Sequence, residues 1–125
     1  MIVDTNALSA IADGEPGMGD VLQRATSMAI PVIVLGEYGF GVAQSTRRNH
    51  HQKWLRENIP GFRILDISRE TAEHYAVLRL DLKCAGTPIP SNDLWIAALC
   101  REHKLPVLSR DRHFDRVRGL RRLDW

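Results

Sequence analysis

The sequence predicts an α/β fold, a three-layer α/β/α sandwich around a short, mainly parallel central sheet. Short β-branched runs alternate with longer segments of helical periodicity, which is typical of parallel strands connected by helices. The chain has 125 residues, of which 44% are hydrophobic and 26% charged, as expected for a packed core. Because no repeat or linker-like tract interrupts the chain, we expect one domain over residues 1–125.

The start of the chain is predicted to form strand, helix, helix and strand, at residues 2–3, 7–12, 18–25 and 29–35. The first strand ends at Asp4-Thr5-Asn6, three residues that favour a helix start. Gly14-Glu15-Pro16-Gly17 separates the two helices, since glycine and proline interrupt helical structure. The second strand is expected to be buried because it is apolar and rich in β-branched residues.

A glycine-rich helix is expected to follow, around Glu37. Each of its glycines, Gly36, Gly39 and Gly41, lowers helix propensity by about 1 kcal/mol relative to alanine. We therefore expect another part of the chain to pack closely against this helix.

The rest of the chain continues the alternation of helices and strands. Residues 46–58 predict a polar surface helix closed by Pro60-Gly61, and a helix opened by Ser68 is predicted to end near Gly86. Residues 94–100 are apolar on all sides, which indicates a buried central helix. Strands are predicted at 63–67, 105–109 and 120–123, with a short helical turn at 111–117.

The cysteine content and the N-terminus favour a cytoplasmic protein. Cys84 and Cys100 are too few for a disulfide framework, and both are expected to be reduced, buried thiols. Residues 1–4 carry no basic segment, and no stretch of about 18 apolar residues occurs. We therefore expect neither export nor insertion into a membrane.

Four acidic residues are expected to meet at one edge of the sheet. Asp4 and Asp111 follow predicted strands, Asp93 opens the buried helix, and Glu37 lies in the glycine-rich helix. In parallel sheets, ligands bind beyond the carboxyl ends of the strands. Clustered carboxylates repel one another unless cations neutralise them, and Mg²⁺ and Mn²⁺ prefer oxygen ligands. Such sites often cleave phosphodiester bonds with two metal ions.

Helix capping is the alternative explanation for three of these acids. Asp4, Asp93 and Asp111 all stand at predicted helix starts, where a carboxylate accepts hydrogen bonds from free backbone N–H groups. Glu37 does not fit that explanation, because an unpaired carboxylate among apolar residues and glycines is costly. A metal ion or a polar network is expected around it.

Four segments carry a resemblance to a known family. They are Asp4-Thr5-Asn6 after the first strand, Glu37 with Gly41, Asn92-Asp93 before the apolar helix, and the segment from Ser109 to Phe114. In this order, and over essentially the whole chain, they resemble the motifs of PIN-domain ribonucleases. The similarity is greatest to the VapC-type toxins of bacterial and archaeal toxin–antitoxin pairs.

The resemblance implies an endoribonuclease toxin that hydrolyses RNA, depends on Mg²⁺ or Mn²⁺ and is inhibited by a cognate VapB-like antitoxin. It also implies a homodimer. Four acids would hold the metal, and two polar residues would orient these acids and the attacking water. The acids are Asp4, Glu37, Asp93 and Asp111, and the polar residues are Asn6 and Ser109.

Two other functions remain open at this point. A phosphoaspartyl phosphatase or receiver domain also places acids at strand ends, but such phosphatases need a second aspartate where Asn6 stands, and receivers need paired acids and a lysine. A catalytically silent binding module would use the same acids only as helix caps. Metal binding would distinguish that module from a nuclease.

Several polar residues have both a structural and a functional explanation. Asp115 is expected at the surface, with an auxiliary catalytic role as the alternative, and the histidines lack the spacing of a metal site, although His113 could contact substrate. The net charge is +2, and two basic sets stand out that would be solvated or would contact RNA phosphates. They are Arg110, Arg112, Arg116, Arg118, Arg121 and Arg122, and Arg47, Arg48, Lys53 and Arg56.

Overall fold

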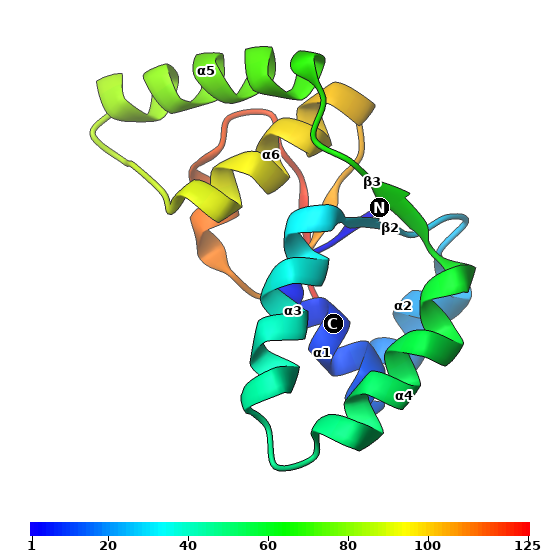
Figure 1. Cartoon of the computed structure of the whole chain (residues 1–125). Coiled ribbons are helices and arrows are strands. Elements are labelled where there is room, and N and C mark those ends of the chain that lie inside the picture. Colours follow the sequence, from blue (N-terminus) through cyan, green and yellow to red (C-terminus); the bar gives the residue numbers. More distant parts are fainter.

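Five short strands form one parallel sheet in the order β3-β2-β1-β4-β5 in a computed structural model that describes residues 1–125 (Figure 1). The central strand β1 pairs with β2 through Ile2 and Ala29 and with β4 through Val3 and Leu108. The strands are β1 (Ile2–Val3), β2 (Ala29–Pro31), β3 (Arg63–Leu65), β4 (Val107–Leu108) and β5 (Arg122–Leu123). The predicted α/β class is confirmed, and all the strand pairs are parallel.

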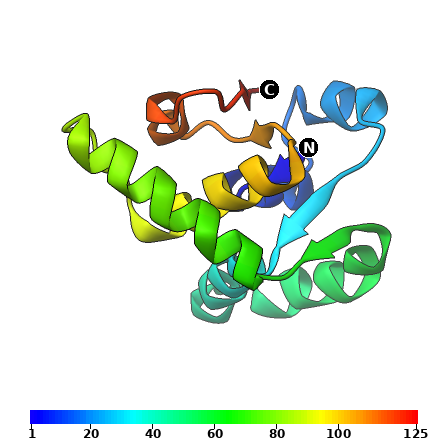
Figure 2. The same ribbon diagram turned by 90° about the horizontal axis from the view of Figure 1, so that it is seen from above.

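Six α-helices and two short 3₁₀ helices connect and cover the strands. In both views α5 lies outside α6 and packs against it, while α3 packs against both α1 and α4 (Figures 1 and 2). No helix combines the length and apolar composition that a membrane-spanning segment needs. The helices are α1 (Thr5–Asp13), α2 (Met18–Arg24), α3 (Val32–Gln44), α4 (Arg48–Asn58), η1 (Ile59–Gly61), α5 (Arg69–Cys84), α6 (Ser91–His103) and η2 (Arg112–Arg116).

Helix α6 is the central buried helix that the sequence predicts. Its residues Leu94, Ile96, Ala97, Ala98, Leu99 and Cys100 are all buried. At its outer side, the Trp95 ring stacks on Tyr75 of α5 with 4.0 Å between ring centroids. Because α6 is held on both sides, its first turn, which carries Asp93, has a fixed position relative to the sheet.

The prediction of a strand over residues 29–35 is wrong for its second half. Strand β2 ends at Pro31, and Val32 to Leu35 form the first turn of α3. The neighbouring strands β1 and β3 are only two and three residues long, so no backbone partner exists beyond the pair Pro31 and Leu65. β-branched residues follow the available packing more than an intrinsic strand preference, and here they begin a helix.

Two further expectations are wrong. Cys84 is exposed at the end of α5, while Cys100 is buried, and burial raises the pKa of the Cys100 thiol to about 12. The glycines of α3 have no closely packed neighbour, because a Cβ at Gly36, Gly39 or Gly41 would meet no atom within 4 Å beyond its adjacent residues and the surrounding backbone of α3. These glycines therefore weaken the helix without a compensating contact.

We predict that Gly39→Ala raises the free energy of unfolding by about 0.5–1 kcal/mol, because alanine restricts the unfolded chain and fits the open space. Gly14→Ala is the control. Gly14 has φ +63° at the end of α1, where a Cβ costs about 1–2 kcal/mol. Urea denaturation of both variants checks the pair, and a destabilised Gly39→Ala would contradict the open environment of α3.

Candidate active site

Asp4 is a buried carboxylate at the carboxyl end of β1, with only 4% of its surface exposed. It accepts hydrogen bonds from Ser109 Oγ at 2.6 Å, from Asn6 Nδ2 at 3.0 Å and from the Thr5 backbone N–H at 2.7 Å. Its own backbone N–H donates to the carbonyl of Leu108 at 3.1 Å. The pairing of β1 with β4 thus places Asp4 beside Ser109.

Asn6 and Ser109, the two polar residues expected to orient the acids, form one network. Asn6 Nδ2 lies 3.0 Å from Ser109 Oγ, and its Oδ1 accepts from the Arg110 backbone N–H at 3.2 Å. Ser109 is fully buried and its Oγ also accepts from the Asp111 backbone N–H at 2.9 Å. The network therefore connects the segment after β1 to the segment after β4.

Glu37 connects α3 to two other helices. One of its carboxylate oxygens accepts a hydrogen bond from Thr5 Oγ1 of α1, and the other accepts from Asn92 Nδ2 of α6. Glu37 is half-buried, so its expected polar partners are present. Thr5 and Asn92 were not predicted as its partners, because nothing in their spacing shows that the first turns of α1 and α6 meet the middle of α3 here.

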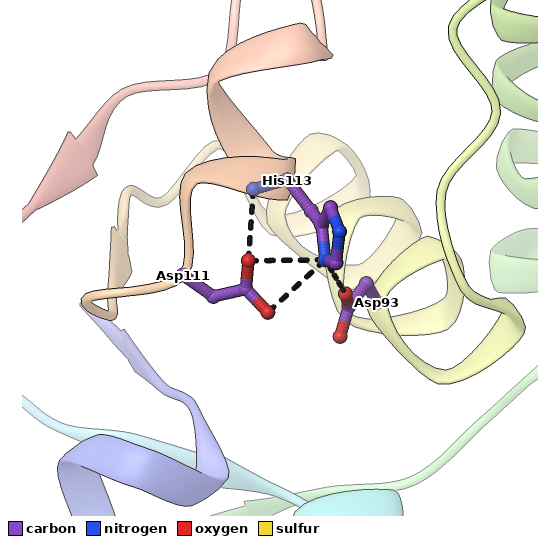
Figure 3. A group of neighbouring side chains, drawn as sticks. All are labelled: Asp93, Asp111 and His113. Atoms are coloured by element: carbon purple, nitrogen blue, oxygen red, sulfur yellow. Dashed lines mark hydrogen bonds and ion pairs between the residues drawn. The ribbon is translucent and has the colours of Figure 1, made fainter.

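Asp93, Asp111 and His113 form a tight group at the solvent side of the site (Figure 3). His113 Nδ1 lies 3.0 Å from both Asp93 Oδ2 and Asp111 Oδ1. These three side chains offer ligand atoms within 4.8 Å of one another. The sequence spacing gave His113 no metal-binding partner, yet the fold brings Asp93 from α6 to it. The feature of the sequence that placed His113 near the site was its position two residues after Asp111.

The four acids repel one another. Burial is the main cause that raises the pKa of Asp4, with the charges of Glu37 and Asp111 adding to it and hydrogen bonds from Ser109 and Thr5 opposing it. Burial, followed by the charges of Asp111 and Asp4, raises the pKa of Asp93 to about 6, against the effect of His113. Each acid thus lies within the electrostatic reach of another, and a cation among them would relieve the repulsion.

Helix capping explains only part of this arrangement. Asp4 accepts from the first N–H of α1, and Asp111 accepts from the His113 backbone N–H at 2.9 Å. The Asp93 carboxylate contacts His113, and α6 begins without a side-chain cap. Glu37 lies in the interior of α3. Two of the four acids therefore cap nothing.

The acids border an open polar hollow of about 460 Å³. Residues 90–93, Glu37, Asp111 and His113 line it, with no hydrophobic side chain among them. Carboxylate oxygens are the donors that hard divalent cations prefer, so this lining is chemically suited to Mg²⁺ or Mn²⁺. Asp4 lies buried beside the hollow and adds a further negative charge.

Asp115 has no contact with the four acids. It pairs with Arg122, at 2.8 Å from Nε to Oδ1, and half of its side chain is exposed. Arg122 Nη1 also donates to the Ser109 carbonyl at 2.9 Å. Asp115 is therefore part of a surface ion pair beside the site.

Comparison with known proteins reveals clear similarity over nearly the whole chain. The PIN domain family matches residues 1–120. Ribonuclease VapC2 of Rickettsia felis is 29% identical, over 99% of this chain and 96% of its own length. Ribonuclease VapC5 of Mycobacterium tuberculosis is 30% identical, over 94% of this chain and 87% of its own.

Solved structures agree with these sequence matches. One similar structure is that of VapBC2 from Rickettsia felis bound to a DNA fragment from their promoter. A chain of that structure superposes with a TM-score of 0.90 at 26% identity, covering 99% of this chain and 97% of that one. FitAcB of Neisseria gonorrhoeae gives a TM-score of 0.87 at 27% identity, covering 98% and 95%. The same parallel sheet, the family match and the named relatives together show that the chain belongs to the PIN-domain family, among its VapC ribonucleases.

Proposed function

We propose that residues 1–125 act as one domain, a metal-dependent endoribonuclease that hydrolyses RNA phosphodiester bonds and serves as the toxin of a toxin–antitoxin pair. The convergence of Asp4, Glu37, Asp93 and Asp111 on one edge of the sheet carries this proposal. The names of the VapC relatives support ribonuclease activity. We also propose a cytoplasmic location, a compartment in which such an RNA substrate is found.

The same four carboxylates would hold Mg²⁺ or Mn²⁺. When bound there, the metal would supply positive charge that offsets the scissile phosphate and makes a nearby water more acidic. Ser109 and Asn6 hold the Asp4 carboxylate in place, and Thr5 and Asn92 hold Glu37. This preorganisation means that the oxygen donors need little rearrangement on binding.

His113 is placed to pass protons at the solvent side. Its Nδ1 lies 3.0 Å from Asp93 Oδ2, and its side chain lines the open hollow. Because Asp93 would serve as a metal ligand and stay ionised, the His113 imidazole would take the proton that the attacking water gives up, and the departing 3′-oxygen would receive a proton from the hollow.

The two alternative functions lack this support. A phosphoaspartyl phosphatase needs a second aspartate where Asn6 stands. A receiver domain has the strand order 2-1-3-4-5, whereas this sheet has the order 3-2-1-4-5. A silent binding module would use its acids only as helix caps, but Glu37 and Asp93 cap no helix. Both are held close to the other two acids despite the repulsion between their charges.

We predict that Asp4→Asn and Asp93→Asn each lower Mg²⁺-dependent RNA cleavage by at least about a hundredfold, since each removes a metal ligand and a charge at the reacting phosphate. Cleavage of a labelled RNA measures the activity. Asp20→Asn, which changes an acid in the first turn of α2, should leave the rate unchanged. Wild-type rates in both site variants would exclude the proposed enzyme.

A binding measurement separates metal dependence from activity. Mn²⁺ should raise the Tm of the wild-type chain, because binding to the folded state alone stabilises it. Asp93→Asn should lose most of this increase, and Asp20→Asn should retain it. Calorimetry showing no Mn²⁺ binding to the wild type would support the binding module instead.

We predict that Asp93 contributes a loss of stability to the metal-free protein as the pH rises from about 4 to above 6. The pKa of Asp93 is about 6 in the folded state and about 3.9 in the unfolded chain. The folded state therefore binds the proton more tightly, and the stability from this site is full below pH 4 and lost as the pH rises through 6. Asp4, whose pKa is also raised, acts in the same direction.

Urea unfolding in EDTA at several pH values tests this dependence. The difference in free energy of unfolding between Asp93→Asn and the wild type should shift in favour of the variant as the pH rises. Asp20→Asn serves as the matched control. Parallel pH profiles for all three proteins would show that Asp93 does not contribute the predicted pH dependence of stability.

We also propose a VapB-type antitoxin as a partner, and a homodimer. Several structural neighbours are solved as VapBC complexes. The surface offers apolar side chains for assembly, since Phe40 is 67% exposed and Leu80 60%.

Co-expression with a small antitoxin from an adjacent reading frame should yield a complex that no longer cleaves RNA. Sedimentation should show a dimer that Phe40→Ser weakens while the chain stays folded. A monomeric wild type at micromolar concentration would exclude the homodimer.

A further inference from the structure

A cationic cleft of about 540 Å³ lies at the opposite end of β4 from the acids. The acids follow the carboxyl end of β4, at Ser109 to Asp111, whereas Leu105 and Pro106, which precede the strand, line the cleft. Its other walls are the last turns of α6 and the loop over residues 117–121 that leads to β5. The cleft and the proposed catalytic site thus lie at opposite ends of the same part of the sheet.

The cleft lining contains four cations and no acid. The cations are Arg101, Lys104, Arg118 and Arg121. None of them lies within 4.0 Å of a carboxylate. By contrast, Arg110 and Arg122, which belong to the same C-terminal basic set as Arg118 and Arg121, pair with Glu15, Asp115 and Asp124. Favourable interaction with the end of α6 accounts for Arg101 and Lys104. Arg118 and Arg121 come from a separate loop and need another explanation.

A groove continues from the cleft toward the acids. It shares Arg101, Val117 and Arg118 with the cleft and adds Arg116, with Asp81 as its one acid. Arg116 Nη1 donates to the Pro88 carbonyl at 3.0 Å, two residues before Pro90, which lines the acidic hollow. Cations without carboxylate partners therefore follow one surface from the end of η2 to the cleft.

The chemistry of the lining favours phosphate groups as the ligand. Arginine and lysine side chains bind phosphate oxygens, and runs of them follow a nucleic-acid backbone. No aromatic residue lines the cleft or the groove, so neither offers a surface on which bases could stack. The expected contact is with the backbone, independent of base sequence.

We propose that this cationic cleft binds the phosphodiester backbone of the substrate RNA, several nucleotides away from the scissile bond. The proposal rests on the proposed function for the identity of the polyanion. It assigns RNA binding to the α6 and C-terminal surface and not to the second basic set, on α4. The cleft would add affinity and orient the strand, while the acids would perform the cleavage.

A pair of triple variants with equal loss of charge tests the proposal. Lys104→Gln, Arg118→Gln and Arg121→Gln together remove three of the four positive charges of the cleft. They leave Arg101, which donates to the Arg118 carbonyl at 3.3 Å, in place. Arg47→Gln, Arg48→Gln and Lys53→Gln together neutralise α4. Binding of a labelled single-stranded RNA of about 16 nucleotides is measured in EDTA over a range of salt concentrations, so that no cleavage occurs.

The cleft variant should bind at least about tenfold more weakly at low salt. The slope of log K against the logarithm of the salt concentration should be smaller in magnitude by about 2, as expected for three lost phosphate contacts. The α4 variant should bind like the wild type. Equal losses in both variants would indicate a net-charge effect and overturn the proposal. A loss confined to the α4 variant would place the RNA on α4 and also overturn it.

Cleavage of a short RNA separates this proposal from the proposed function. With Mg²⁺, the cleft variant should cleave an oligonucleotide of about 4 nucleotides as the wild type does, and the longer RNA more slowly at low concentration. A wild type that binds the longer RNA through the cleft but cleaves neither would refute the nuclease and leave the cleft as a binding site. Impaired cleavage of the short RNA by the cleft variant would refute a role confined to the distant backbone.

Discussion

The hydrogen bonds that hold the buried Asp4 carboxylate are the interaction on which the site depends. A carboxylate with 4% exposure is costly unless its oxygens are satisfied, and Ser109, Asn6 and the first N–H of α1 satisfy them. Ser109 can reach Asp4 only because β4 lies beside β1 in the sheet. The order of two short strands therefore sets the position of the first acid.

The other acids are placed by packing around this centre. Helix α6 lies buried between the sheet and α5, which fixes Asp93, and Glu37 is held where α1, α3 and α6 meet. Burial, and after it the repulsion between the acids, raises the pKa of both Asp4 and Asp93. Stability is thus reduced locally at the place where a cation could restore it, as is common at functional sites.

Charge is separated along the sheet. The acids occupy the carboxyl end of β4, and a group of cations without carboxylate partners occupies the other end and the surface at the end of η2. The formal charge of +2 conceals this separation. Arg110 and Arg122 support the fold through their ion pairs, whereas Arg118 and Arg121 remain available to an external anion.

The order of elements and the four acids could be predicted from local pattern. β-branched runs and helical spacing depend on neighbouring residues, and a parallel sheet necessarily brings its carboxyl ends to one edge, which is why Asp4 and Asp111 were expected together. The second half of the strand expected at 29–35 could not be predicted, because its state depends on whether β1 and β3 offer backbone partners there.

Only the tertiary structure decided which polar side chains meet. His113 joins the acids because α6 brings Asp93 to it. Thr5 and Asn92 hold Glu37 because the first turns of α1 and α6 meet the middle of α3. The basic C-terminal set separates into paired and unpaired arginines only once acids from distant segments are in place. A sequence states which charges a chain carries, but Coulomb interactions act through space, so the fold determines which of them are neutralised.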